Sequence, residues 1–395
     1  MSAATMSHGL RSRERAPFAW DLVTLGLVAA LLLIGLIMVT SASMSIAARG
    51  LHDPFYYLER QFTYGVVGVL LAWFVSRIPS ALWDRYSLPL LMFGLSLLLL
   101  VKIPGIGATV NGAERWVRIG PLNFQVSELA RVLVLNWVCS YCVRKRAELE
   151  KTLPGLAKPV CLLALAAFFL LLEPDFGAAT VLFATGFAVL FVAGARLRDV
   201  ALLFCIAVVA FGLLAVVSPY RLKRMTGFLD PWADPFNSGF QLTQSLIAIG
   251  RGEWFGVGLG SSVQKLFYLP EAHTDFVFAV LAEELGLVGV LGVIGLFLAL
   301  VWRSFQISRM AAQAGLAFQS YLALAFGVWI GLQATVNIGV NMGVLPTKGL
   351  TLPLLSYGRS SLLVTLAWIG VLMRIHHEAK LNSRSAVMRA VAGGR

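Results

Sequence analysis

One carboxylate stands where a long polar segment meets an apolar one: Asp275, in the sequence Glu271-Ala-His-Thr-Asp-Phe. A carboxylate that stays accessible at such a point can take a proton as a general base. Asp and Thr are also common first residues of helices, so Asp275 or Thr274 could cap the helix that follows. Capping by the carboxylate would make it a poorer base, whereas repulsion from Glu271 would make it a better one. The sequence is compatible with both roles.

Two further segments carry cations that could bind an anion. The first is Asn111-Gly-Ala-Glu-Arg-Trp-Val-Arg118, and the second, 342–361, holds two prolines, three glycines and Lys348. Proline and glycine interrupt helices and free backbone N–H groups, which could meet a phosphate together with Lys348. A tight hairpin whose cations reach toward water explains these residues equally well. The candidate substrate-binding residues are Glu114, Arg115, Arg118, Glu271, His273, Lys348, Ser356 and Tyr357.

Charged residues also occur inside apolar segments, where they are functional candidates because burying a charge is costly. Glu128 and Arg131 are three residues apart, so they share a helix face and can pair. They are either a self-neutralising pair that locks two helices together or part of a polar cavity. Glu283 and Glu284 are adjacent, so on a helix they point about 100° apart and cannot both face one place.

The composition predicts that all these residues belong to a membrane protein. Hydrophobic residues make up 58% of the chain, charged residues 13%, and the mean hydropathy is +0.80. Soluble domains carry about a quarter charged residues. Apolar runs long enough to cross a bilayer must be helical, because lipid satisfies no backbone polar group. We therefore expect an all-α integral membrane protein of about ten transmembrane helices, near 20–43, 61–79, 87–103, 124–143, 157–173, 176–194, 199–218, 276–302, 316–345 and 354–373.

The loop charges predict the orientation. The segments assigned to one side hold nineteen of the 32 basic residues and seven of the 20 acidic ones. By the positive-inside rule this side is the cytoplasm, and it includes both termini. We expect cytoplasmic tails at 1–19 and 375–395, with a single membrane domain at 20–374 between them. The basic balance reflects topology and contact with anionic membrane lipids, and not nucleic-acid binding.

The segment 219–275, between the seventh and eighth predicted spans, is longer than a plain connection requires. It is rich in aromatic residues, which favours an ordered loop on the periplasmic side over a disordered one. Its part 239–250 has apolar residues at helical spacing but is too short to cross a membrane, so we expect an interfacial or re-entrant helix there.

Several motifs in this order resemble the SEDS proteins (shape, elongation, division and sporulation), over nearly the whole chain. They are Asn111-Gly-Ala-Glu-Arg-Trp, Glu173-Pro-Asp-Phe-Gly, 270–286, 341–353 and Ser356-Tyr-Gly. The segments 240–250 and 348–353 are more similar to the cell-division branch than to the elongation branch. Two positions depart from the family pattern: Arg359 replaces a usual glycine, and Val126 a usual proline.

The resemblance implies a ten-span peptidoglycan glycosyltransferase that polymerises lipid II at the division septum of the bacterial inner membrane, with its active site facing the periplasm. It implies that Asp275 is the essential catalytic residue. We expect Asp275 to act as general base in an inverting displacement of undecaprenyl pyrophosphate. Lys348, Arg115 or Arg118 would stabilise the pyrophosphate, and a divalent cation, Mg²⁺ or Mn²⁺, held by Asp275 or Glu271 could assist.

The same resemblance implies partners: a class B penicillin-binding transpeptidase and other membrane proteins of the division machinery. Two alternatives from other functional classes remain. A lipid II flippase would use Glu128, Arg131 and Glu283 as a polar path across the bilayer. A structural scaffold for division proteins would need no catalytic residue. A polymerase requires polar groups at one end of the bundle, and the nearly charge-free spans 20–43, 61–79 and 199–218 favour this interpretation.

Overall fold

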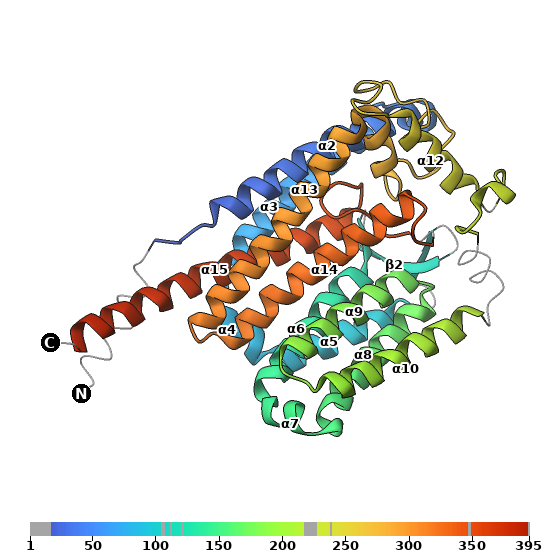
Figure 1. Cartoon of the computed structure of the whole chain (residues 1–395). Coiled ribbons are helices and arrows are strands. Elements are labelled where there is room, and N and C mark those ends of the chain that lie inside the picture. The colour runs from blue at the N-terminus through green and yellow to red at the C-terminus, as the bar shows by residue number, and fades with distance from the viewer. Residues whose placement is uncertain are drawn as a thin grey trace.

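The computed structural model describes residues 17–103, 107–110, 113–119, 122–216, 227–237, 239–346 and 349–393. In this part of the chain the fold is a bundle of long helices (Figure 1). The helices are α2 (Leu22–Leu51), α3 (Tyr56–Arg77), α4 (Ser80–Arg85), α5 (Ser87–Leu100), α6 (Val126–Arg144), α7 (Arg146–Lys151), α8 (Leu153–Leu172), α9 (Phe176–Val192), α10 (Leu197–Val216), α12 (Phe240–Arg251), α13 (Val277–Gln313), α14 (Ala317–Asn341) and α15 (Arg359–Gly393), with a 3-10 turn, η1, at Pro231–Ala233.

Each predicted span overlaps one long helix of the structure. Six helices in the described part of the chain are long and apolar enough to cross a membrane, and α5 and α9 are shorter apolar helices. The chain is therefore a multi-pass membrane protein. Several helices run further than predicted, most of all α13, which continues to Gln313, and α15, which continues to Gly393 through the segment expected to be a tail.

The expectation of an all-α fold is wrong in one place. A three-stranded antiparallel sheet, β1 (Gly107–Val110), β2 (Ala113–Ile119) and β3 (Leu122–Gln125), precedes α6. Trp116 on β2 lies opposite Ala108 on β1 and Gln125 on β3. The sequence carried a signal for this sheet, because Asn-Gly at 111–112 between alternating residues is a strong hairpin pattern.

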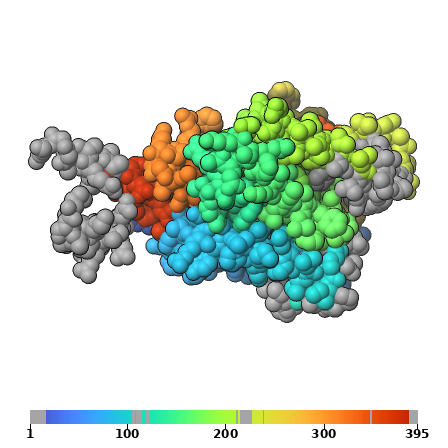
Figure 2. All heavy atoms as spheres, turned by 90° about the horizontal axis from the view of Figure 1, so that it is seen from below, coloured from blue at the N-terminus to red at the C-terminus, as the bar shows by residue number. Residues whose placement is uncertain are grey.

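Aromatic packing helps to fix the centre of the bundle. Trp329 of α14 and Trp368 of α15 are buried with ring centroids 5.0 Å apart, and Phe326 lies 5.5 Å from Trp368. Seen from below, α5 (light blue) lies along α6 (green), with which it packs (Figure 2). Buried aromatic rings of this size supply much of the packing contact between helices.

The two ends of the bundle differ (Figure 1). The sheet and α12 lie at one end, here called the sheet end, and α4 and α7 lie toward the other. α2 begins and α15 ends at the end opposite α12. The described ends of the chain therefore lie opposite the sheet and α12.

Candidate active site

Asp275 lies two residues before α13, which begins at Val277 with Phe276 as its N-cap residue. The main-chain oxygen of Glu271 closes the preceding turn by accepting the N–H groups of Thr274 at 3.1 Å and Phe276 at 3.2 Å. The Thr274 hydroxyl donates to the Glu271 carboxylate at 2.6 Å. Neither Thr274 nor Asp275 is the N-cap, which corrects the capping alternative. Asp275 is partly exposed.

Two asparagines of α14 hold the backbone at Asp275. The Nδ2 atoms of Asn337 and Asn341 donate to its main-chain oxygen at 3.0 and 3.1 Å. Both asparagines are buried. Sequence reasoning missed them, although a carboxamide within an apolar helix is a signal that could have found them.

The hairpin segment 349–352 passes beside the carboxylate of Asp275. A β-carbon added to Gly349 would lie 3.1 Å from Oδ2 of Asp275, so a side chain there would crowd the carboxylate. The main-chain oxygen of Leu350 accepts Nδ2 of Asn337 at 2.5 Å. The Leu350 side chain packs against Gly177 of α9, where a β-carbon would come within 2.8 Å of it. The start of α9 thus adjoins the aspartate through this hairpin.

Arg115 of β2 reaches the turn between α8 and α9. Its Nε donates to the main-chain oxygen of Glu173 at 2.6 Å, and its Nη2 donates to that of Pro174 at 2.6 Å. Its Nη1 lies 3.9 Å from the Asp175 carboxylate. Arg115 therefore orients this turn. The N–H donors that it uses for this purpose are the ones with which it could otherwise bind a phosphate.

Asp175 joins three elements at the sheet end. Its Oδ1 caps α9 by accepting the N–H of Ala178 at 3.1 Å. Its Oδ2 accepts Nε2 of Gln125, the last residue of β3, at 3.4 Å. The N–H of Gln125 in turn donates to the Ser360 hydroxyl, at the start of α15, at 2.8 Å. The sheet, α9 and α15 are therefore tied together near the hairpin that contacts Asp275.

Glu173 is a buried carboxyl group in the same turn. Burial, followed by the negative charge of Asp175, raises the pKa of Glu173 to about 8. Among the residues that the structure describes, neither of its carboxyl oxygens has a hydrogen-bond partner. Glu173 is therefore mainly neutral near pH 7. The burial of Glu173 was not predicted from the sequence, where this residue appears only as part of the motif Glu173-Pro-Asp-Phe-Gly.

Three of the predicted substrate-binding residues lie in or next to a tight cluster with α3. The ring of His273 lies 4.5 Å from that of Tyr57, which contacts the Tyr357 ring at 5.0 Å. The Ser356 hydroxyl accepts the N–H of Leu352 at 2.8 Å. Burial lowers the pKa of His273 and raises that of Tyr357. All three candidates are buried, so in this structure they pack the loop before α13 against the hairpin.

The structure describes the remaining predicted substrate-binding residues only in part. Arg118 is exposed on β2, opposite Asn123 of β3. The backbone of Glu114 pairs with that of Thr109, and its side chain lies outside the described part of the structure. Lys348 directly precedes Gly349 in the sequence and also lies outside the described residues.

The predicted pair within α6 is brought together. Nη2 of Arg131 lies 2.5 Å from Oε2 of Glu128, and the two side chains are 1% and 5% exposed. A buried charge is tolerated when it is paired in this way. The pair therefore neutralises itself inside the bundle.

α13 is interrupted nine residues after it begins. Gly286 has φ 63° and ψ −164°, a region open essentially to glycine alone. The interruption frees the main-chain oxygens of Glu283 and Glu284, which accept the N–H groups of Val257 at 2.9 Å and Gly258 at 3.1 Å. The loop after α12 therefore replaces the missing helical hydrogen bonds.

The side chains of Glu283 and Glu284 fasten this loop to the bundle. Glu283 pairs with Arg251 at 3.3 Å. Glu284 pairs with Lys265 at 2.7 Å and accepts the Ser41 hydroxyl of α2 at 2.7 Å. Both glutamates are fully buried, and both also contact Ser262: Glu283 accepts its hydroxyl, and Glu284 accepts its N–H at 3.4 Å. The expectation that adjacent positions cannot face one place is therefore wrong here.

The model of the FtsW/RodA/SpoVE cell-cycle proteins matches residues 22–381. The chain belongs to this family. Among curated relatives, "Probable peptidoglycan glycosyltransferase FtsW" of Thioalkalivibrio sulfidiphilus is 54% identical over 99% of this chain and 98% of its own. The relative of the same name from Legionella pneumophila is 51% identical over 92% of each chain.

Solved structures agree with this membership. Thermus thermophilus RodA, a rod shape determining protein, superposes with a TM-score of 0.67 at 30% identity, over 91% of this chain and 97% of its own. A chain from a peptidoglycan synthase complex that coordinates polymerization and crosslinking superposes with a TM-score of 0.75 at 32% identity, over 92% of this chain and 99% of its own.

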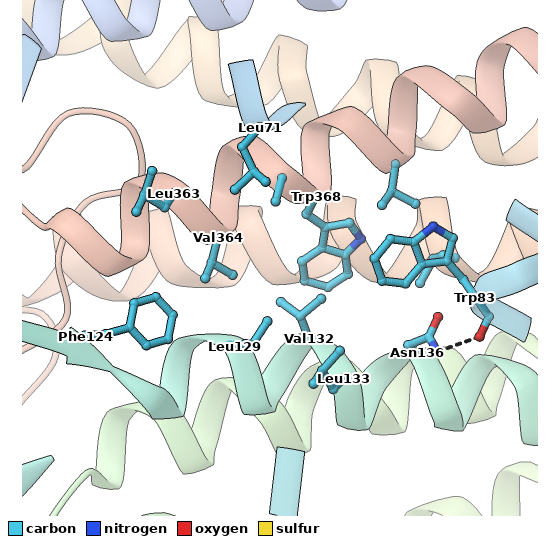
Figure 3. A pocket seen from close by; sticks show the side chains of 13 residues that line it. Leu71, Trp83, Phe124, Leu129, Val132, Leu133, Asn136, Leu363, Val364 and Trp368 are labelled. Atoms are coloured by element: carbon cyan, nitrogen blue, oxygen red, sulfur yellow. Dashed lines mark hydrogen bonds between the residues drawn. The ribbon is translucent and has the colours of Figure 1, made fainter. Parts of the chain in front are cut away.

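This FtsW/RodA/SpoVE protein also has an apolar cavity of about 200 Å³ between α6 and α15 (Figure 3). Leu133 and Val132 of α6 face Trp368 and Val364 of α15 across it. Asn136, on its wall, donates Nδ2 to the main-chain oxygen of Trp83 at 3.0 Å. The lining suits hydrocarbon and not a sugar or a phosphate.

Within the described residues of this family member, no group of three or more His, Cys, Asp or Glu side chains is arranged to hold a metal ion. The divalent cation expected at Asp275 or Glu271 stays a prediction, because two carboxylates alone are an incomplete ligand set for Mg²⁺ or Mn²⁺ unless water or substrate phosphates supply the rest.

Proposed function

We propose that this protein is a peptidoglycan glycosyltransferase that polymerises lipid II into β-1,4 glycan strands during cell division. The observation that carries the proposal is similarity over nearly the whole chain to relatives named as peptidoglycan glycosyltransferases. The partly exposed Asp275 at the start of α13 supplies the acid–base group that the chemistry needs.

The reaction joins a sugar hydroxyl to an activated sugar. The 4-hydroxyl of one glycan attacks the anomeric carbon of another, whose bond to undecaprenyl pyrophosphate breaks. An α-linked donor that gives a β-linked product requires inversion in a single displacement. Pyrophosphate leaves as an anion, so the second carboxyl group that an inverting glycosidase uses as acid is not needed. One base at the hydroxyl and positive charge at the pyrophosphate suffice.

In this proposal Asp275 takes the proton from the attacking hydroxyl. The Glu271 carboxylate accepts the Thr274 hydroxyl at 2.6 Å and so fastens the turn before α13. The glycine at 349 supports the assignment of Asp275, since a larger residue there would crowd its Oδ2 atom.

The pyrophosphate would be met by Arg118 and Lys348. Arg118 is exposed on the sheet, and Lys348 adjoins Gly349 in the sequence. Arg115 is a weaker candidate than predicted, because two of its donors are taken by the main chain at 2.6 Å. Positive charge at this point would stabilise the leaving group as it forms.

The proposal includes an orientation and a partner. Ten spanning helices with both termini in the cytoplasm would place the sheet end, with Asp275, at the periplasmic surface of the inner membrane, where the lipid II headgroup is polymerised. A class B penicillin-binding transpeptidase would crosslink the product. The similarity to a chain from a synthase complex that coordinates these two steps supports this partner.

The flippase alternative is less well supported. Its polar path would need charged groups free to meet a headgroup inside the bundle, yet Glu128 pairs with Arg131 and Glu283 with Arg251. The groups proposed for that path are therefore already neutralised.

A polymerisation assay in detergent separates the two functions, because micelles offer no second leaflet to which lipid II could be flipped. The full chain, purified with its penicillin-binding partner whose transpeptidase is blocked by a β-lactam, is offered fluorescent lipid II. We expect glycan polymer resolved on a gel. The proposal would be refuted if the complex formed no polymer at any concentration while a known polymerase was active in the same micelles.

A further inference from the structure

Asn337 joins two segments that are distant in sequence. Its single NH₂ group donates to the main-chain oxygen of Asp275 at 3.0 Å and to that of Leu350 at 2.5 Å. A primary amide carries two N–H donors, so both are used. Neither acceptor lies within a helix, so no helical ladder fixes the spacing between the two segments.

Asn341 lies one helical turn further along α14, on the same face. Its Nδ2 donates to the Asp275 main-chain oxygen at 3.1 Å, and its Oδ1 accepts the N–H of Ala279, in the first turn of α13, at 3.2 Å. The two asparagines are 2% and 0% exposed, so water does not compete for these bonds. Asn341 thus ties the turn at Asp275 to the helix that follows it.

These bonds act on the backbone of Asp275 and use neither oxygen of its carboxylate. By holding the backbone, these bonds set the distance between Asp275 and Gly349, the residue beside the Oδ2 atom of Asp275. Displacement of a catalytic group by about 1 Å can lower a rate by about 100-fold.

We propose that Asn337 and Asn341 are positioning residues that hold the general base and the hairpin at 349–352 in fixed register for glycosyl transfer. This inference rests on the proposed function of Asp275. It assigns to α14 a role in turnover beyond helix packing.

The test compares Asn337→Leu and Asn341→Leu with a matched control, Asn136→Leu. Asn136 is also a buried asparagine that donates to a main-chain oxygen, but that acceptor is Trp83 at the other end of the bundle. We measure kcat and KM for lipid II in detergent, using the full complex at a temperature well below the unfolding midpoint of each variant. We expect kcat to fall about 30-fold or more in the two α14 variants, with KM within about twofold, and the control to keep kcat within about twofold.

Asn337→Asp provides a readout that a purely structural role would not move. A protonated aspartic acid keeps one O–H donor and can restore one of the two bonds, whereas the ionised form can restore neither. The kcat of Asn337→Asp, divided by that of the wild type at the same pH, should therefore rise as the pH falls from about 8 to about 6. This variant also decides the matter if Asn337→Leu does not fold.

Leucine variants whose kcat stays within about twofold of the wild type would overturn the inference, as would a pH-independent ratio for Asn337→Asp. Asp275→Asn is measured alongside. If Asp275→Asn keeps the wild-type rate, the proposed function of Asp275 fails and takes this inference with it. If Asp275→Asn is inactive while the asparagine variants are not, the inference alone fails.

Discussion

At the scale of single residues, two carboxyl groups at the sheet end have different surroundings. Asp275 is partly exposed, and its backbone is held by α14. Glu173 is fully buried, and neither of its carboxyl oxygens has a hydrogen-bond partner in the described part of the chain. Burial favours the neutral form of a carboxyl group, so Glu173 holds a proton that Asp175 helps to retain.

This difference predicts how stability depends on pH. The pKa of Glu173 is raised from 4.5 to about 8 by burial, so between these values the folded state holds a proton that the unfolded state has lost. The contribution of Glu173 to the free energy of unfolding is thus fully present below about pH 4.5. It is lost as the pH rises toward 8, at up to about 1.4 kcal/mol per pH unit.

Glu173→Gln removes the titrating group and keeps its shape. Thermal unfolding in detergent at about pH 5, 6.5 and 8 should show a smaller loss of stability in this variant than in the wild type. Parallel curves for the two proteins would show that Glu173 does not bind a proton in the folded state.

At the scale of elements, α13 works as two pieces joined at Gly286. The first piece carries Asp275 at its start and Glu283 and Glu284 near its end, and the loop 253–258 closes the gap between the pieces. A β-carbon at Gly286 would lie 2.3 Å from the backbone nitrogen of Gly256. The interruption therefore depends on glycine for both its conformation and its space.

Gly286→Ala should destabilise the protein by at least about 2 kcal/mol, because it adds backbone strain and a steric clash. Gly292→Ala, further along the same helix, is the matched control. Nothing lies within 4 Å of its added β-carbon, so it should be neutral or stabilising by up to about 1 kcal/mol. Unfolding midpoints of the two variants in detergent make the comparison, and equal midpoints would contradict this account of the interruption.

The sequence predicts the long helices well because an apolar run of spanning length allows one backbone solution in lipid. It predicts α12 almost to the residue, from apolar spacing alone. It does not predict the interruption at Gly286, since a glycine in an apolar helix is also expected where helices pack closely. The sheet was missed because β1 and β3 are only four residues long and β2 carries three charged residues, as a polar loop would.

Some residues of the candidate site could likewise be predicted from the sequence, and others could not. Asp275 is found from its type and its position before an apolar run, and Glu128 with Arg131 from their spacing. Asn337 and Asn341 are not found, because their role depends on which distant backbone reaches α14. The burial of His273 and Tyr357 likewise depends on the packing of the loop before α13 against the hairpin.

At the scale of the whole molecule, the bundle separates polar chemistry from apolar support. The sheet, α12, the hairpin and the start of α13 gather at the sheet end, while the apolar cavity lies between α6 and α15 within the bundle (Figures 1 and 3). The proposed reaction thus needs one accessible base at one end of a membrane bundle.

The central claim is that Asp275 is this base, and the initial rate of lipid II polymerisation by Asp275→Asn tests it most directly. Glu253→Gln, which alters an exposed carboxylate in the long loop before α13, is the control. We expect Asp275→Asn to lose at least about 100-fold in rate while the control and the wild type agree within about twofold. A folded Asp275→Asn protein that polymerises lipid II at the wild-type rate would contradict the account.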